Sequence, residues 1–275
     1  MRRPAVAGSF YPASKEALTQ ELSRLLGERP RVGPGLLGPV GLIVPHAGYI
    51  YSGPVAAVGY RALAELGRPE AAVILGTNHS GLGGPITVPN TPEPWEIPLG
   101  EMPVEDGLWR DLAALPGVVR DDLPFLREHS IEVQLPFLYF IYGLLPFVPA
   151  VVSTTRREVI RPFGEGLADL LRGKSVAIIA STDFTHYEPH LVAKRKDEVA
   201  LEHIRKLDLE GFLRVVRDLD ISICGVGAVG ILITVAAELG LQEVEVLGYA
   251  TSGETSGFFE EVVGYAAVLF REGKG

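Results

Sequence analysis

Three histidines follow short apolar runs of the kind that form buried parallel strands. These are residues 40–44 before His46, residues 71–75 before His79 and residues 175–180 before His186. The runs are short and β-branched, and Gly and polar turn residues bound them. Because ligands of open α/β sheets bind outside the carboxyl ends of the strands, we predict that the three imidazoles converge on one site.

The single cysteine, Cys224, is a candidate to share a metal with two of these histidines. It precedes two glycines at a predicted helix start, where free N–H groups and the helix dipole favour a thiolate. A thiolate and the imidazoles of His46 and His79 would form a three-ligand site with an open position for water or substrate. The alternatives are a buried, unreactive cysteine and histidines that only cap turns.

Asp183 and His186 lie in one polar cluster, residues 181–188, after the third apolar run. A histidine with a nearby carboxylate is typical of a general acid/base, because the carboxylate orients the ring and raises its basicity. We therefore predict that His186 transfers a proton and that Asp183 orients it. Capping of the following turn is the alternative role for Asp183.

Three further side chains are candidates for contacting a substrate. His129 lies at a predicted helix start, where a cation is unfavourable, so a neutral imidazole is expected there. Tyr49 and Asn78 lie in the loops that carry the first two histidines, and the glycines of these loops leave room for a ligand.

Composition and charge exclude several classes of protein. The chain has 275 residues, 47% of them hydrophobic, and its formal net charge of −9 argues against a nucleic-acid binder. No apolar run approaches the roughly 20 residues of a membrane span, and the N-terminus lacks the apolar stretch of a signal peptide. We therefore expect a cytoplasmic protein that binds neither nucleic acid nor membrane. One cysteine excludes an intrachain disulfide, and the scarcity of Asn, Gln and Met indicates a thermophilic source.

Strand and helix patterns alternate along the chain without a break in composition. Helices are predicted at residues 15–26, 54–66, 104–114, 129–142 with a kink at Pro136, 191–207, 209–219 and 225–239, and one more ends at Leu171. Further strands are predicted at residues 86–88, 95–97, 147–152, 243–249 and 261–270, the last two joined by a polar turn. The Gly- and Pro-rich residues 81–100 are predicted to form a hairpin or lid over the strand ends. The pattern indicates a single α/β domain over residues 1–275, with a mixed, mostly parallel sheet flanked by helices.

Several segments carry a resemblance to a known family. They are Pro4–Pro12 (PAVAGSFYP), Pro45–Gly53 (PHAGYIYSG), Glu128–Leu138 (EHSIEVQLPFL), Ser181–Glu188 (STDFTHYE) and Val263–Tyr265 (VGY). In this order they resemble the MEMO family, whose bacterial and archaeal members are called AmmeMemoRadiSam system protein B. That family is similar in fold to class III extradiol dioxygenases, which are non-haem iron enzymes that open catechol rings.

The resemblance implies roles for individual residues. His46 and His79 match the two histidine ligands of the dioxygenases, His186 matches their acid/base, and Cys224 falls where they carry a glutamate ligand. The thiolate makes the site softer and shifts it from iron(II) toward copper(I) or zinc. The expected cofactor is therefore one divalent or reduced transition metal, iron or copper, with zinc as a third option.

Three hypotheses of function follow from these residues. The first is a metal-dependent redox enzyme that acts on a small molecule. The second is a non-catalytic metal carrier or scaffold that binds a protein partner. The third is a cysteine hydrolase in which a histidine activates Cys224.

Overall fold

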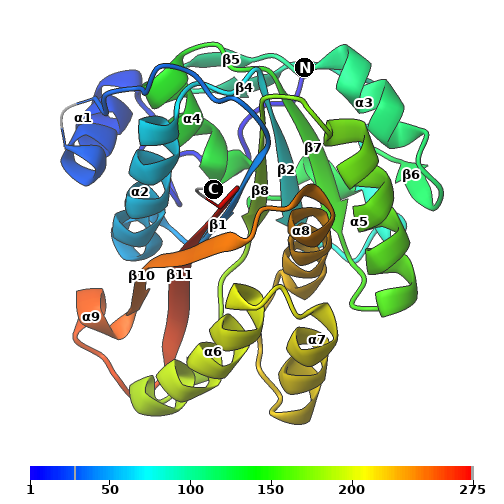
Figure 1. Ribbon diagram of the computed structural model, residues 1–275. Helices are drawn as coiled ribbons and strands as arrows, with labels where there is room; N and C mark the ends of the chain where they lie inside the picture. The colour runs from blue at the N-terminus through cyan, green and yellow to red at the C-terminus, as the bar shows by residue number, and fades with distance from the viewer. Residues whose placement is uncertain (28, 274–275) are drawn as a thin grey trace.

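One large sheet runs through the molecule, which the computed structural model describes for residues 1–27 and 29–273 (Figure 1). Its strand order is β10-β11-β1-β8-β2-β7-β3-β6, and β9 pairs with β11. The strands of this sheet are β1 (Val40–Val44), β2 (Ala71–Thr77), β3 (Ile86–Val88), β6 (Val118–Arg120), β7 (Phe147–Val152), β8 (Val176–Ser181), β9 (His186–Glu188), β10 (Glu243–Thr251) and β11 (Val262–Arg271). A separate two-stranded sheet contains β4 (Trp95–Ile97) and β5 (Gly100–Met102).

The four central strands, β1, β8, β2 and β7, are parallel to one another. All their residues are buried, because helices cover both faces of this part of the sheet. β11 runs antiparallel to β1 and to β10, and β3 runs antiparallel to β7. The predicted mixed, mostly parallel sheet in an α/β fold is confirmed.

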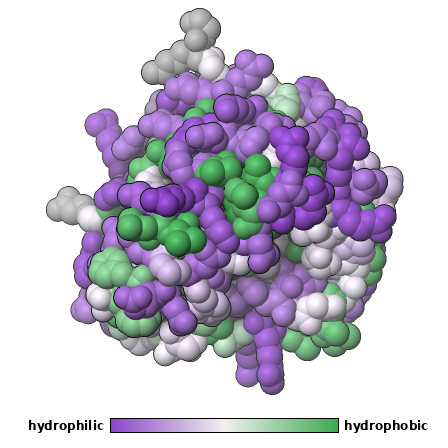
Figure 2. Space-filling view, turned by 90° about the horizontal axis from the view of Figure 1, so that it is seen from below, coloured by the Kyte–Doolittle hydropathy of each residue, from purple (hydrophilic) through white to green (hydrophobic). Residues whose placement is uncertain are grey.

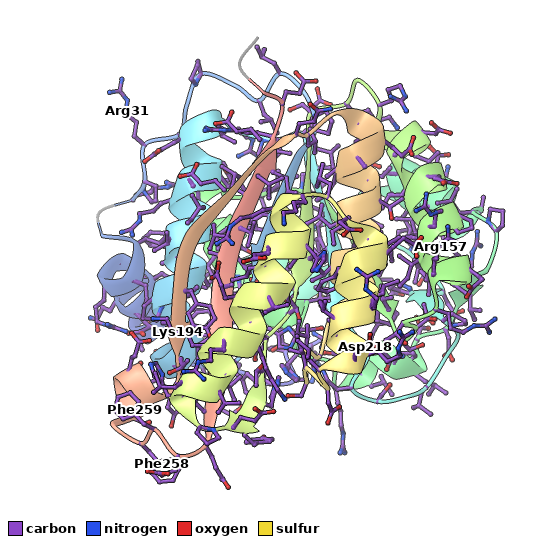
Figure 3. The ribbon with its side chains drawn as sticks, turned by 60° about the horizontal axis from the view of Figure 1, so that its bottom comes forward. Arg31, Arg157, Lys194, Asp218, Phe258 and Phe259 are labelled. Atoms are coloured by element: carbon purple, nitrogen blue, oxygen red, sulfur yellow. The ribbon has the colours of Figure 1, made fainter. Side chains whose placement is uncertain are left out.

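Helices form a layer on each face of the sheet (Figure 1). The first layer contains α1 (Lys15–Leu26), α2 (Tyr49–Leu66) and α4 (Leu135–Tyr142), and the second contains α3 (Asp106–Ala113), α5 (Arg157–Leu171), α6 (His190–Arg205), α7 (Leu209–Asp218) and α8 (Val226–Leu239). Alternate side chains of β1 enter the two cores, since Leu42 packs with the first layer and Ile43 with the second. Charged side chains such as Arg157 and Asp218 project from the outer faces of α5 and α7 (Figure 3).

The apolar helix α8 brings Cys224 to the carboxyl ends of the strands. Two glycines at its start allow this close approach. A Cβ atom at Gly225 would lie 2.5 Å from Cβ of Thr182, and one at Gly227 would lie 2.2 Å from the Thr154 carbonyl oxygen. Any larger residue would push the start of α8, and with it Cys224, away from the ends of β7 and β8.

The structure corrects three local predictions. The β4–β5 hairpin is not a lid over the carboxyl ends, because Trp95 packs edge-on against Phe147, the first residue of β7, with ring centroids 5.5 Å apart. Residues 129–142 do not form one kinked helix: a 3-10 turn (Glu132–Gln134) precedes α4, and Pro136 lies in the first turn of α4, where its missing N–H costs nothing. The turn before β11 contains a short helix, α9 (Gly253–Ser256).

The carboxyl-end face of the molecule is seen from below in Figure 2. Its surface is mostly hydrophilic and is interrupted by separate apolar patches. Phe258 and Phe259, which follow α9, project at this end (Figure 3), and both are exposed. Within the described residues, no helix is long and apolar enough to cross a lipid bilayer.

Candidate metal centre

The structure brings His46, His79 and Cys224 together at the carboxyl ends of the central strands. His46 follows β1, His79 follows β2 and Cys224 precedes Gly225, the N-cap residue of α8. One donor atom from each residue lies within 4.8 Å of the other two. His46 is buried at 2% exposure, whereas the side chain of His79 is 37% exposed, so the cluster opens to solvent on the His79 side.

Cys224 lies in a pocket of hydrogen-bond donors. Its Sγ is 3.2 Å from Nε2 of His46 and accepts from the backbone N–H of Asp183 at 3.2 Å. The hydroxyls of Thr77 and Thr182 lie 3.8 and 3.7 Å from the same sulfur. Burial raises the pKa of the Cys224 thiol, but the charge and hydrogen bonds of His46 and His79 outweigh burial and hold this pKa well below its ordinary value. This lowered pKa favours the thiolate, the form that binds metals.

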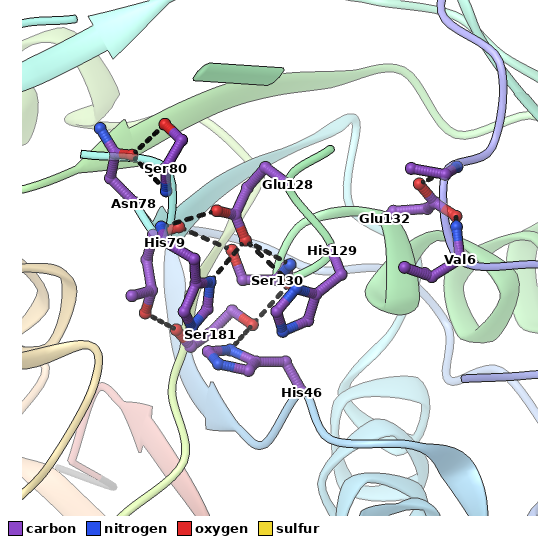
Figure 4. Close-up of polar contacts among 12 residues, drawn as sticks. Val6, His46, Asn78, His79, Ser80, Glu128, His129, Ser130, Glu132 and Ser181 are labelled. Atoms are coloured by element: carbon purple, nitrogen blue, oxygen red, sulfur yellow. Dashed lines mark hydrogen bonds and ion pairs between the residues drawn. The ribbon is translucent and has the colours of Figure 1, made fainter. Parts of the chain in front are cut away.

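A carboxylate supports the second histidine. Nδ1 of His79 is 2.9 Å from Oε1 of Glu128, and the backbone N–H of His79 donates to Oε2 of the same carboxylate at 2.9 Å (Figure 4). Burial would raise the pKa of Glu128, but the bonds from His79 lower it to about 2. Because an ionised carboxylate only accepts hydrogen bonds, Nδ1 of His79 carries a proton and Nε2 is the atom left to bind a metal.

Nearby negative charge raises the pKa of both candidate ligand histidines. Burial lowers the pKa of His46, but the negative charges of Cys224 and Asp183 outweigh it and raise this pKa to about 9. For His79, burial is likewise outweighed by hydrogen bonds to Cys224 and Glu128, and the pKa rises to about 10. The negative charges of Cys224 and Glu128 thus balance the two imidazolium rings until a metal displaces the protons.

His129 completes a cluster of three imidazoles. Its ring stacks on His79 with centroids 4.4 Å apart and meets the ring of His46 edge-on at 5.3 Å. Burial, and then the positive charges of His46 and His79, lower its pKa to about 3. The neutral imidazole predicted for His129 is therefore present next to the centre, although its cause is burial and the two charged rings and not a helix dipole.

The third strand-end histidine, His186, is held differently from the prediction. Its ring Nδ1 lies 2.8 Å from the carbonyl oxygen of Ser222, which can only accept, so Nδ1 is the protonated nitrogen. The carboxylate of Asp183 accepts from the backbone N–H of His46 at 2.8 Å. The expectation that Asp183 orients the ring of His186 is therefore wrong, because Ser222 does so and Asp183 holds the His46 loop. The role of His186 in proton transfer stays a prediction.

Two of the predicted substrate contacts have structural partners instead. Tyr49 is 3% exposed, and its hydroxyl donates to the carbonyl oxygen of Val133 at 2.6 Å. The side-chain oxygen of Asn78 accepts from the backbone N–H groups of Ser80 and Gly81 at 3.1 and 3.0 Å, which closes the loop around His79. The buried hydroxyl of Tyr49 is thus used within the protein, and a substrate contact of Tyr49 does not fit the structure. A substrate contact of Asn78, which is partly exposed and donates through its side-chain nitrogen to the Leu82 carbonyl oxygen, stays a prediction.

Sequence reasoning missed Glu128, Ser181 and Gln134 as supports of the ligands. Ser181 Oγ is 3.0 Å from Nδ1 of His46, and Gln134 donates to that oxygen at 2.8 Å. All three residues belong to segments that carry the family resemblance, 128–138 and 181–188. Membership of these segments was the one feature of the sequence that could have pointed to them. A carboxylate at a predicted helix start, such as Glu128, is explained by the helix dipole alone, and nothing local in the sequence pairs Glu128 with His79.

Comparison with known proteins agrees with this geometry. The family model described as "Memo-like protein" matches residues 2–269. This chain belongs to the Memo family. A MEMO1 family protein of Pyrobaculum arsenaticum is 47% identical over 98% of this chain and 99% of that relative, and one of Methanopyrus kandleri is 44% identical over 99% of each. A third MEMO1 family protein, from Thermotoga neapolitana, is 41% identical over 98% of this chain and 99% of its own length.

A solved structure shares the Memo fold at low sequence identity. The crystal structure of an uncharacterized protein from Escherichia coli K12 aligns with a TM-score of 0.53 and 15% identity, and covers 84% of this chain and 98% of its own. This likeness supports the architecture described above. The Memo family membership predicted from the sequence motifs is confirmed.

Proposed function

We propose that this Memo-family protein binds one transition metal through His46, His79 and Cys224 and uses it in redox chemistry on a small oxygen-bearing molecule. One observation carries the proposal: two imidazoles and a thiolate, distant in sequence, place their donor atoms within 4.8 Å of one another. A tetrahedral metal with bonds of about 2.0–2.3 Å separates its ligands by roughly 3.3–3.8 Å. The site therefore needs only small shifts to close around an ion.

The donor set fits a metal of intermediate softness. Imidazole suits iron, copper and zinc, and thiolate favours copper(I) and zinc over harder ions. When bound, a redox-active metal would supply electron transfer and a Lewis-acidic position for an oxygen atom. We therefore propose iron or copper as the functional metal, with zinc as the redox-inactive alternative.

The protein supplies the acid/base group and the surroundings of the reaction. Since Nδ1 of His186 is protonated and held by the Ser222 carbonyl oxygen, Nε2 is the atom that would take a proton from the substrate. His129 is neutral and packs against His79, so it offers a polar contact without adding positive charge beside the ligands.

Metal analysis of anaerobically purified protein, followed by oxygen uptake on a panel of catechols, tests the proposal. We expect one metal per chain and turnover that is lost in Cys224→Ala and in His46→Ala. Thr234→Val is a matched control, because its buried hydroxyl donates only to the Gly230 carbonyl oxygen within α8. Bound metal without turnover on any substrate would contradict the redox role.

A metal carrier that delivers its ion to a protein partner is the second candidate. The exposure of the His79 side chain favours it, because an exchangeable ion needs one accessible ligand. Tight copper(I) binding without oxygen uptake, together with transfer of copper to a partner recovered by pull-down, would support this role.

A cysteine hydrolase is the third candidate, and the 3.2 Å contact of Cys224 with His46 favours it. A thiol-directed inhibitor distinguishes it from the other two. Equal labelling of Cys224 with and without metal would support the hydrolase, whereas protection by metal would contradict it.

A further inference from the structure

We infer that Ser181 and Gln134 are positioning residues that hold the His46 ring with its Nδ1 proton on Ser181 and its Nε2 directed at the metal centre. The inference rests on the proposed metal site and adds the residues that orient one of its ligands. It follows from counting the donors and acceptors of a buried network that contains His46, Ser181, Gln134 and Tyr60 (Figure 4 shows His46 and Ser181).

The hydroxyl of Ser181 sets the direction of the bond to His46. Ser181 Oγ lies 2.6 Å from the carbonyl oxygen of Ser130, and a carbonyl only accepts, so the single hydroxyl proton points there. Nδ1 of His46 is 3.0 Å from the same Oγ. With the hydroxyl proton already used, this contact is a hydrogen bond only if Nδ1 is the donor.

Gln134 also requires that His46 donates to Ser181, because its amide group donates to the same hydroxyl oxygen. Its Nε2 lies 3.0 Å from the Pro45 carbonyl oxygen and 2.8 Å from Ser181 Oγ, and the first contact requires that this end of the amide is the NH₂ group. Its Oε1 accepts from the hydroxyl of Tyr60 at 2.8 Å. The amide therefore cannot flip to take the Ser181 proton away from Ser130.

Because the network is buried, its hydrogen bonds can adopt only one set of directions. Ser181, Gln134 and Tyr60 are all fully buried, so no water competes for their donors and acceptors. Reversal of any one bond would leave a backbone carbonyl oxygen, of Pro45 or Ser130, without a donor, and an unpaired buried polar group is costly. The two carbonyl oxygens thus determine which nitrogen of His46 is free, and that nitrogen, Nε2, faces Cys224 at 3.2 Å.

The two ligand histidines consequently have different supports. His79 donates to the carboxylate of Glu128, and His46 donates to a neutral hydroxyl. A carboxylate partner raises the basicity of a ligand imidazole more than a hydroxyl does. Ser181 and Gln134 thus orient the His46 ring without adding negative charge to it. Glu128 both orients the His79 ring and places a negative charge beside it.

Nuclear magnetic resonance of the wild-type protein tests the orientation directly. In long-range proton–nitrogen spectra of the zinc(II)-loaded protein, we expect His46 to bind through Nε2 and to keep a slowly exchanging proton on Nδ1. The same Nδ1 proton should exchange slowly in the metal-free protein. Zinc bound through Nδ1, or an Nδ1 proton that exchanges as fast as that of a solvent-exposed histidine, would overturn the inference without the need for any variant.

A Ser181→Ala variant tests the consequence for metal binding. Loss of a partner that orients a ligand typically costs 10–100-fold in affinity, and we expect Ser181→Ala to weaken zinc(II) binding roughly 10-fold and to speed Nδ1 exchange. The control Thr234→Val should change neither value. Unchanged zinc affinity in a folded Ser181→Ala protein would overturn the inference. Failure of the wild-type protein to bind zinc, iron or copper would instead contradict the proposed function, and slow exchange of the Nδ1 proton in the metal-free protein would still report the hydrogen bond from His46 to Ser181.

Discussion

Glu128 and His79 are joined twice, because both the ring Nδ1 and the backbone N–H of His79 donate to the two oxygens of the Glu128 carboxylate. The backbone N–H of Ser130 donates to the same carboxylate at 2.8 Å. One buried side chain therefore fixes the loop, the ring and the tautomer of a candidate ligand that is itself partly exposed.

Replacement of Glu128 by Gln should weaken metal binding without removing a ligand. The amide keeps the shape of the side chain but loses the negative charge that supports the His79 ring, so we expect zinc(II) affinity to fall roughly 10–100-fold. Chelator competition measures the change. Asp197→Asn is the control, because Asp197 is a buried carboxylate that accepts from Thr185 and Tyr249. Equal losses in the two variants would show that the effect is not specific to the His79 support.

Replacement of Cys224 by Asp should change which metal is preferred. A carboxylate oxygen is a harder donor than a thiolate, so affinity for copper(I) should fall by more than tenfold while iron(II) is retained. Competition between the two ions under anaerobic conditions measures the ratio. An unchanged preference would mean that the sulfur does not contact the metal.

Metal affinity should rise steeply with pH. The pKa values of about 9 for His46 and about 10 for His79 lie above neutral pH, so we expect both rings to be protonated in the metal-free protein at pH 7, and the lowered pKa of Cys224 favours its thiolate. Metal binding must then displace two protons, and the apparent affinity should increase up to roughly 100-fold per pH unit below pH 9 and level off above pH 10. Proton release on titration with zinc(II) in weakly buffered solution checks the count. An affinity that is constant between pH 6 and 8 would contradict protonated ligands.

His186→Gln should separate proton transfer from metal binding. We expect metal affinity to stay within about twofold, because His186 is held by Ser222 and is outside the ligand group. Turnover on any substrate that the wild-type protein oxidises should drop roughly 10²–10⁴-fold, the usual contribution of a general acid/base. Full activity in this variant would remove His186 from the reaction.

Glu132→Ala should destabilise the whole protein through its N-terminal segment. The buried carboxylate of Glu132 accepts from the backbone N–H groups of Ala5 and Val6, from the Tyr11 hydroxyl and from Arg2. Removal of one partner from a buried ion pair costs about 3–5 kcal/mol, and urea denaturation should report a loss of this size. An exposed control, Glu210→Ala, should change the free energy of unfolding by less than about 1 kcal/mol. Equal stability of wild type and Glu132→Ala would contradict the anchoring role.

The sequence predicted the parts of this molecule that depend on local pattern and sheet topology. Buried parallel strands have a recognisable apolar run, so the positions of His46 and His79 at the ends of β1 and β2, the two strands that flank β8, could be derived from residues alone. Cys224 could be placed only by assuming where its helix packs, and its glycine neighbours turn out to be what allows that packing.

The supports of the site could not be derived in the same way. The bond between His79 and Glu128 depends on how an irregular segment folds back over the strand ends, and no periodicity encodes that path. The orientation of His186 by Ser222 has the same origin, since residues 220–223 lie in a loop whose position is set by α7 and α8. The location of the β4–β5 hairpin is a third case, because it is determined by the packing of Trp95 on Phe147.

The wide separation of the three donors along the chain has a consequence for biosynthesis. A nascent chain that has emerged only through residue 79 carries His46 and His79 but has no sulfur donor, so the complete donor set exists only after the start of α8 has been made and docked. An ion that bridges residues 46 and 224 closes a very long loop of the unfolded chain, and ligands that bind only the native state stabilise it by mass action. Metal binding would thus stabilise only chains that have finished folding, and truncated chains would bind no metal at this site.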